Sequence, residues 1–363
     1  MYYDIWNNKF SKIYNMNGII LNSKLLYVNN YEKTIYNALL EWREEISQNP
    51  SVVPIIVHAD QHCNLSINNK IFSYVRNYIS LDKLSACIGL GDVANFSTNW
   101  YEQMLGCLKD IEKEKQINIW GNHDTWTDNA DNNYVITSNE LKILNTYFDN
   151  SKYNTNHKYG NHGIEYMIDE KRKIKYVVLN GLNFTSRAAY VITSDDMDYI
   201  IEILSQADDY DIVILSHIQP FTNMETSSWN HPPVEEGSQG GSGGMDIVVG
   251  TMAGASPPID QMLIDRKNKA SGTVKDSYKN EHSYDFTNCT SDLICCLAGH
   301  EHCDKYMWQN NNILIYIFDA YAYDNHPFYL VNINRVKKRL NMWKIDDSPT
   351  VYNYQIPFEK ITT

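Results

Sequence analysis

The chain has 363 residues, of which 43% are hydrophobic and 27 are tyrosine, so it can form its own core and is not disordered by composition. Its 31 Lys and Arg against 44 Asp and Glu residues give a formal net charge of −13, which disfavours binding of long nucleic acid through phosphate contacts and suits a protein that binds cations. No stretch approaches the roughly 20 apolar residues of a membrane-spanning helix, and the first ten residues lack the pattern of a secretory signal, so we expect a cytoplasmic protein without a membrane partner.

Residues 1–50 are predicted to be an N-terminal extension that precedes one main domain, residues 51–363. The extension begins as a polar, Asn-rich stretch and ends in a predicted helix over residues 31–48. In that helix Ile35, Leu39, Trp42 and Ile46 recur at spacings of four, three and four residues, which makes one apolar stripe. We expect the stripe to pack on the main domain.

Short runs rich in Val, Ile and Leu follow, and they predict strands. The first six are residues 55–57, 84–90, 117–120, 176–179, 212–215 and 293–297. They lack polar alternation, which is typical of strands covered on both faces. Helical patterns at residues 65–79, 100–115 and 195–206 separate several of them, and Thr193 or Ser194 could cap the last helix. This alternation predicts an α/β fold.

The sequence has three further features. Residues 313–318, 328–333 and 340–345 predict a strand meander that closes a second sheet. Residues 218–288 contain several prolines and a Gly/Ser run at 237–244, and they predict a long irregular, lid-like insertion. Cys87, Cys295 and Cys296 lie inside the apolar runs, so we expect free core thiols there.

Candidate metal ligands follow five of the predicted strands. They are Asp60 and His62 after 55–57, Asp92 after 84–90, Asn122 after 117–120, His217 after 212–215, and His300 and His302 after 293–297. Strand ends in an open α/β sheet meet at one edge, so these side chains should lie together. Imidazole, carboxylate and amide ligands without thiolate suit Mn, Fe or Zn. The set is too large for one ion and fits two ions bridged by a carboxylate, an arrangement that hydrolyses phosphate esters.

Spacing gives a further expectation about the paired ligands. Asp60 and His62, like His300 and His302, are two residues apart. In extended backbone, residues at this spacing point to the same side.

The ordered pieces Asp60-Gln61-His62, Gly91-Asp92, Gly121-Asn122-His123-Asp124, His217 and Gly299-His300-Glu301-His302 resemble the motifs of the calcineurin-like metallophosphoesterases. The resemblance covers residues 53–345 and leaves out the extension and most of the insertion. It implies a four-layer α/β sandwich, in which helices flank two mixed β-sheets. It also implies one ion held by Asp60, His62, Asp92 and His302, and a second held by Asp92, Asn122, His217 and His300, so that Asp92 bridges.

The same resemblance implies roles in catalysis. His123 would act as general acid for the leaving oxygen, Asp124 would orient it, and a hydroxide shared by two divalent transition-metal ions (Mn, Fe or Zn) would be the nucleophile. The main domain would then hydrolyse a small phosphate ester. Trp120 stands where protein Ser/Thr phosphatases of this superfamily usually have Arg, which favours a phosphodiester or small nucleotide substrate. The alternative is a non-hydrolytic binding or scaffold component of a larger, phage-related assembly.

Three residues outside the motifs are candidates for substrate binding. Arg187 could hold a phosphate, because a guanidinium matches phosphate oxygens, although a plain surface arginine is the commoner case. His231 and His282 could reach the site from the insertion. The insertion starts directly after His217 and ends before the strand that leads to His300, so we expect both of its ends at the ligand-bearing edge and a role in shaping the substrate pocket.

Overall fold

The structure is a computed structural model of the chain. It describes residues 3–4, 9–10, 19–21, 24–26, 30–62, 83–93, 102, 108, 111–121, 123–124, 157–159, 163–179, 182–183, 189–190, 192–221, 259–300, 302, 304–309, 312–319, 327–345 and 351–360. Within these ranges no helix is both long enough and apolar enough to cross a membrane.

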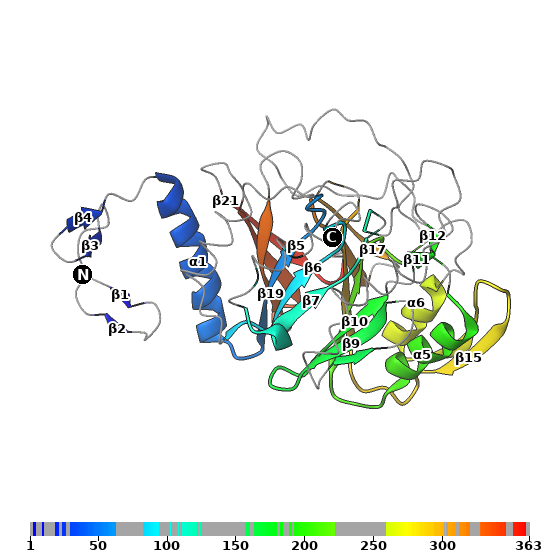
Figure 1. Cartoon of the computed structure of the whole chain (residues 1–363). Coiled ribbons are helices and arrows are strands. Elements are labelled where there is room, and N and C mark those ends of the chain that lie inside the picture. The colour runs from blue at the N-terminus through cyan, green and yellow to red at the C-terminus, as the bar shows by residue number, and fades with distance from the viewer. Residues whose placement is uncertain are drawn as a thin grey trace, which may run out of the picture.

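Two mixed β-sheets form the centre of the molecule (Figure 1). The seven-stranded sheet has the order β17-β18-β16-β13-β10-β9-β8, with the strands Lys305–Gln309, Ile313–Ile317, Leu293–Ala298, Asp211–Ser216, Ile174–Leu179, Ile164–Asp169 and His157–Tyr159. The six-stranded sheet has the order β21-β20-β19-β5-β6-β7, with the strands Val351–Pro357, Arg339–Ile345, Phe328–Asn334, Val52–His58, Ala86–Gly89 and Gln116–Asn118. In the seven-stranded sheet the parallel pairs lie inside and the antiparallel pairs lie at both edges. In the six-stranded sheet β5, β6 and β7 are parallel at one edge, and the remaining pairs are antiparallel.

Four more strand pairs and a short helix lie outside these two sheets. The pairs are β1 (Tyr3–Asp4) with β2 (Lys9–Phe10), β3 (Ile19–Leu21) with β4 (Lys24–Leu26), β11 (Leu182–Asn183) with β12 (Ala189–Tyr190), and β14 (Ser271–Lys275) with β15 (Glu281–Asp285). The short helix is the 3₁₀ turn Lys113–Lys115.

The core forms layers, because successive side chains of each strand point to opposite faces of the sheet. In β5, Val53, Ile55 and Val57 belong to an apolar cluster that includes residues of both sheets. Ile56, between them, belongs instead to the cluster that contains α1. Successive side chains of a strand point to opposite faces, so each sheet buries one face against the other sheet and one face against helices.

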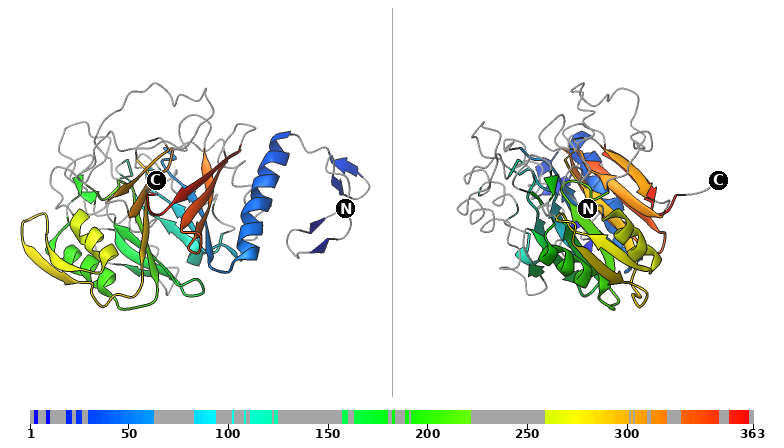
Figure 2. Two further views of the ribbon diagram at one scale, coloured as in Figure 1. Left: turned by 180° about the vertical axis from the view of Figure 1, so that it is seen from behind. Right: turned by 90° about the vertical axis from the view of Figure 1, so that its right-hand side faces the viewer.

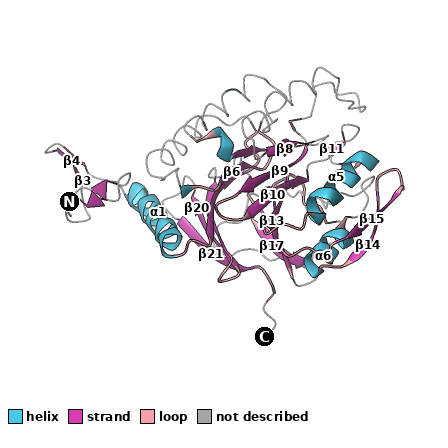
Figure 3. Ribbon diagram, turned by 90° about the horizontal axis from the view of Figure 1, so that it is seen from below, coloured by secondary structure: helices cyan, strands magenta, loops and turns pink. Residues whose placement is uncertain are grey.

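Helices cover the outer faces, which confirms the predicted four-layer α/β sandwich (Figures 2 and 3). On the six-stranded side, α1 (Asn30–Gln48) packs on β5, β19, β20 and β21. Its buried Ile35, Leu39 and Trp42 confirm the predicted stripe. On the other side lie α5 (Ser194–Ser205) and α6 (Asp260–Asn268), and Thr193 caps α5 in a capping box with Asp196.

The predicted strand meander was wrong at residues 313–318. That segment, β18, pairs in parallel with β16 in the seven-stranded sheet, whereas β19 and β20 pair in the six-stranded sheet. Strand β17, which the sequence analysis did not identify, forms an antiparallel pair with β18 and turns the chain back along that sheet. The chain therefore changes sheets between β18 and β19. The predicted helices at 65–79 and most of 100–115 lie outside the described residues.

The prediction of irregular chain was also wrong for residues 259–288. They form α6 and the β14–β15 hairpin, with Ile259, Met262 and Phe286 buried. Because β13 and β16 run parallel, the connection between them has to travel from one end of the sheet to the other. Only the first end of the insertion can therefore lie at the ligand-bearing edge. Residues 222–258 lie outside the described part of the chain.

Candidate metal centre

The candidate ligands lie where strands of both sheets end, an edge that we call the metal edge. Asp60 and His62 follow β5, Asp92 follows β6, His217 follows β13, and His300 and His302 follow β16. Loops of the two sheets are hydrogen-bonded to each other here. The backbone N–H of His300, from the seven-stranded sheet, donates to Asp60 Oδ2, from the six-stranded sheet, at 3.0 Å.

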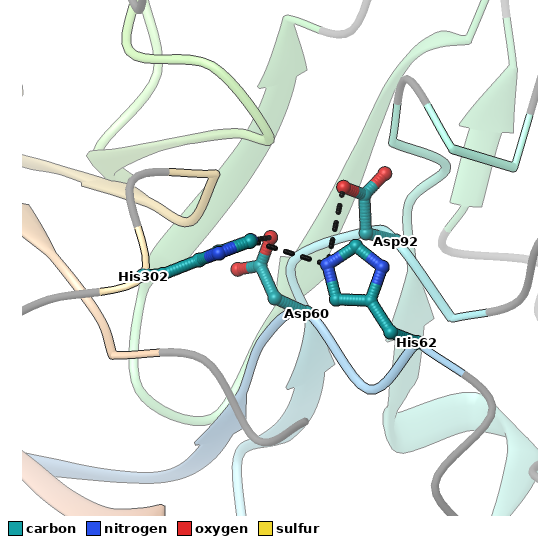
Figure 4. Close-up of side chains that lie close together, drawn as sticks. All are labelled: Asp60, His62, Asp92 and His302. Atoms are coloured by element: carbon teal, nitrogen blue, oxygen red, sulfur yellow. Dashed lines mark hydrogen bonds and ion pairs between the residues drawn. The ribbon is translucent and has the colours of Figure 1, made fainter. Parts of the chain in front are cut away.

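The structure brings six of the predicted ligands into two groups. Asp60, His62, Asp92 and His302 form the first group, and Asp92, His217 and His300 form the second; within each group one ligand atom per residue lies within 4.8 Å of the others. Figure 4 shows the first group, in which His62 Nε2 lies 3.1 Å from His302 Nε2. Asp92 belongs to both groups, as a bridging ligand would.

The Asp92 carboxylate provides a test of whether these residues fit metal ions. Its Oδ1 accepts a hydrogen bond from the backbone N–H of His123 at 2.7 Å. Its Oδ2 is buried and has no hydrogen-bond donor among the described residues, but it lies 3.7 Å from His62 Nε2 and 3.4 Å from His217 Nε2. A buried carboxylate oxygen between imidazole nitrogens suits a divalent cation. The donor set therefore fits divalent metal binding.

The backbone of the ligand residues is unusual. Asp60, His62, Asp92, His300 and His302 have φ values of 53°, 43°, 52°, 74° and 51°. This left-handed region costs a residue with a Cβ on the order of 1 kcal/mol. The expectation that the i, i+2 pairs converge through extended backbone was therefore wrong. They converge because each loop turns sharply at the ligand itself.

Two motif glycines allow this close packing. Gly91 has φ +98°, and a Cβ on it would lie 2.6 Å from the His217 ring. A Cβ on Gly121 would lie 2.1 Å from Asp92 Oδ1 and 2.4 Å from its backbone nitrogen. Any larger residue at Gly121 would have to displace the Asp92 carboxylate.

The metal-free protonation states follow from burial and neighbouring charge. Burial by itself lowers the pKa of His217, but the adjacent Asp92 and Asp60 outweigh it and raise that pKa to about 9. Burial and the charge of His217 lower the pKa of His300 to about 4. Burial favours a protonated Asp92, yet His217 outweighs it and holds the pKa of that carboxyl far below its usual range. One imidazolium thus partly balances the two carboxylates.

A backbone contact orients His217 toward the metal position. Its Nδ1 lies 2.7 Å from the carbonyl oxygen of Leu90, which can only accept, so Nδ1 carries the hydrogen. Nε2 is the ring nitrogen that faces Asp92. A metal-binding histidine is commonly fixed in this way by a backbone carbonyl.

The two predicted catalytic residues lie beside the groups. The His123 ring packs edge-on against His62, with ring centroids 4.6 Å apart, and burial lowers its pKa. The Asp124 carboxylate is fully buried and accepts hydrogen bonds from the backbone N–H of Gly121 at 2.8 Å and of Val93 at 3.2 Å. Asp124 therefore ties the loop after β7 to the loop after β6. Its orientation of His123 stays a prediction.

Of the four remaining candidates, only His282 falls within the described residues. Asn122, Arg187 and His231 fall outside the described residues. His282 lies on β15, where its ring nitrogens contact Asp198 at 2.7 Å and Asp276 at 3.4 Å, and it joins neither metal group. Among the described cysteines, Cys87, Cys289, Cys295 and Cys296 are buried and free, in line with the predicted core thiols.

Asp304, which was not among the predicted site residues, lies two residues after His302 and binds side chains of both sheets. Its signal in the sequence is a carboxylate just after the last histidine motif, followed by Tyr316 and Tyr329 inside otherwise apolar runs. A buried tyrosine hydroxyl needs a partner, so these two phenols indicate a buried polar group nearby.

Comparisons with known proteins gave distant structural likenesses. No protein-family model and no curated protein sequence matches the chain. Its structure is similar to that of a dimetal phosphatase from Danio rerio, at 10% identity over 85% of this chain and 99% of that chain, with a TM-score of 0.46. It is also similar to GAP50, the anchor in the inner membrane complex of Plasmodium, at 8% identity over 85% of this chain and 90% of that chain, with a TM-score of 0.43.

A third similar structure is the NAD nucleotidase of Haemophilus influenzae, at 11% identity over 84% of this chain and 49% of that chain, with a TM-score of 0.35. All three TM-scores are below 0.5, so no inference about this chain rests on them. The resemblance to the calcineurin-like metallophosphoesterases rests on the five ordered motifs and on the two-sheet fold that assembles them.

Proposed function

We propose that this protein is a metal-dependent phosphoesterase that uses two divalent ions at the metal edge. The observation that carries the proposal is the sharing of Asp92 by the two ligand groups, with its Oδ2 buried between His62 and His217. Asp60, His62 and His302 would complete the first site. His217 and His300 would complete the second, together with Asn122. Mn, Fe and Zn suit this mixed donor set.

The ions would supply positive charge for the phosphate oxygens and lower the pKa of a water nucleophile. The protein's own residues would supply the proton for the leaving oxygen. His123, half-buried beside His62, would donate a proton to the leaving oxygen. Because burial lowers its pKa, His123 needs a nearby anion to hold the proton, and a bound phosphate ester is such an anion. Asp124 holds the loop that carries His123 in place.

The residue directly before Gly121 bears on the substrate class. Trp120 is 2% exposed and its indole is uncharged, so it supplies no cation to a phosphate group. A site without the arginine of the protein phosphatases has one fewer contact for a phosphomonoester dianion. We therefore propose a phosphodiester or a small nucleotide as the substrate, in a protein that acts in the cytoplasm.

The test compares hydrolysis of mono- and diester substrates by the protein loaded with Mn, Fe or Zn. In the same assay His123→Ala should keep both ions while kcat on an ester with a poor leaving group falls by roughly 10²–10⁴. Asp92→Ala should lose metal as well as activity. A nitrophenyl ester serves as the control, because its leaving group needs little protonation.

Two outcomes would contradict the proposal. If His123→Ala hydrolysed the ester with the poor leaving group at the parent rate, the assignment of His123 as general acid would be wrong. Tight binding of two ions without hydrolysis of any ester would favour the scaffold interpretation.

A further inference from the structure

The loop that carries His300 and His302 is held at both ends. It joins β16, which ends at Ala298, to β17, which begins at Lys305. At its start, the backbone N–H of Gly299 donates to the carbonyl oxygen of His217 at 3.0 Å. At its other end stands Asp304, which is buried.

The Asp304 carboxylate accepts three hydrogen bonds from side chains. The hydroxyls of Tyr316 and Tyr329 each donate to Oδ1 at 2.8 Å, and Lys344 Nζ donates to Oδ2 at 2.8 Å. Lys344 also donates to Asp319 Oδ2 at 2.7 Å, and the Asp319 backbone N–H donates to the Tyr329 hydroxyl at 3.2 Å. These five residues form a closed network, which we call the Asp304 network.

The Asp304 network joins the two sheets at the level of the metal edge. Tyr316 lies on β18 of the seven-stranded sheet, whereas Tyr329 and Lys344 lie on β19 and β20 of the six-stranded sheet. Tyr329 pairs with Val57, three residues before Asp60. One carboxylate therefore links the loop of His302 to the sheet that carries Asp60.

Asp304 is close enough to His302 along the chain for its hydrogen bonds to restrict the position of His302. Only one residue separates His302 from Asp304, and two residues of chain span at most about 7 Å. His302 is the most exposed histidine in its group, at 31% for its side chain, and has a φ of 51°. Its Nε2 lies 3.4 Å from Asp60 Oδ1 and 3.1 Å from His62 Nε2, and the anchors of its loop add to these contacts in fixing its strained backbone.

We propose that Asp304 is a positioning residue that sets His302 for metal binding, through the hydrogen bonds it accepts from both sheets. This inference rests on the proposed function. Replacing residues that support metal ligands typically weakens metal affinity 10- to 100-fold.

The experiment is a titration of the metal-free protein with Mn, read by calorimetry and by the electron paramagnetic resonance of free Mn. Asp304→Asn keeps the shape of the side chain but removes its charge and one acceptor. We expect one of the two ions to bind 10- to 100-fold more weakly, while the other keeps the parent affinity. Asp276→Asn is the matched control, since Asp276 is also buried, at 2% exposed against 9% for Asp304, and is multiply hydrogen-bonded but lies in the β14–β15 turn. It should leave both affinities unchanged.

Tyr329→Phe removes one hydroxyl, which donates to Asp304 and accepts from the Asp319 backbone N–H, and gives a milder variant in case Asp304→Asn does not fold. It should weaken the same ion in the same direction. Parent affinity for both ions in a folded Asp304→Asn or Tyr329→Phe variant overturns the inference, and so does an equal loss in Asp276→Asn. A parent protein that binds neither Mn nor, in the same titration, Fe or Zn overturns the proposed function itself, which is thus tested separately.

Discussion

Five of the six described ligand residues have a positive φ, and the reason is geometric. Strands of two sheets end around one point, and each chain has to turn at the ligand to bring the side chain inward. The order of ligands after strands could be predicted because strand ends and polar residues are local features of the sequence. The left-handed turns could not, since only a small share of residues other than glycine adopt them, even though Asp and His are enriched among these, and nothing local requires them here.

At Gly121 the geometry predicts a specific effect of adding one methyl group. Gly121→Ala places a Cβ against the Asp92 carboxylate and backbone, so we expect Mn affinity to fall at least tenfold in a folded protein. Gly272→Ala is the control, because its Cβ would meet the Tyr284 side chain on β15, away from the metal edge. Circular dichroism and Mn titration of both variants give the measurement. Equal Mn affinity in Gly121→Ala and the parent would show that Asp92 can move without loss.

The protonation of His217 predicts how metal affinity depends on pH. Its pKa is about 9 in the metal-free protein, so at pH 7 it carries a proton that a metal ion must displace. Apparent affinity for the ion at His217 should therefore rise about tenfold per pH unit from pH 7 and level off near pH 9. Calorimetry in buffers of different ionisation enthalpy should detect about one proton released per ion at pH 7. A flat affinity over this range would contradict the assignment.

The same pKa predicts the stability of the metal-free protein. A raised folded-state pKa contributes stability that is fully present below the ordinary value of 6.5 and is lost as pH rises toward 9. The lowered pKa of His300 affects the stability at lower pH. Its folded-state pKa of about 4 means that stability is lost as pH falls from 6.5 to 4. Metal-free protein should thus be most stable near pH 6.5, and urea unfolding in chelator measures this.

At the scale of elements, periodicity identified α1, α5 and most central strands but not their partners. A run rich in Val and Ile indicates a buried strand but not the sheet that the strand joins. Strand β18 is as apolar as β19, yet the two lie in different sheets. Which sheet a strand joins depends on contacts far away in sequence, such as the pairing of β18 with β16. The hairpin β14–β15 was missed for the opposite reason, because its exposed residues give it almost no apolar signal.

The docking of α1 gives a test at this scale. Trp42 is fully buried, and Glu45 accepts hydrogen bonds from Asn332 at 2.9 Å and Asn334 at 2.6 Å on β19. Trp42→Ala should lower the free energy of unfolding by about 3–5 kcal/mol. Leu40→Ala, at a position 38% exposed, should lower it by less than about 1 kcal/mol. Denaturant unfolding measures both. Similar losses in the two variants would show that α1 does not dock through Trp42.

At the scale of the whole molecule, the two sheets are joined by polar contacts at both ends. The Asp304 network lies at the metal edge, and at the opposite end Ser85 of one sheet donates to Asp169 of the other at 2.6 Å. The sheets should therefore act as one rigid frame, and changes in substrate preference should come from segments attached to the frame. The connection from β13 to β16 is such a segment, because it leaves the metal edge directly after His217.

Within that connection, α6 and the β14–β15 hairpin pack into the outer layer and should stay intact in any deletion. Replacing residues 235–258 with a short Gly/Ser linker removes only chain before α6. We expect unchanged Mn stoichiometry, since no described ligand lies in that segment, together with a changed KM or a changed preference between mono- and diesters. A variant that extends the deletion through Asn268 removes α6 and should unfold at markedly lower denaturant, which separates loss of the frame from loss of a pocket wall. If the 235–258 variant has the parent's kinetics on every substrate, that segment does not contact substrate, and the pocket is formed by the loops of the frame alone.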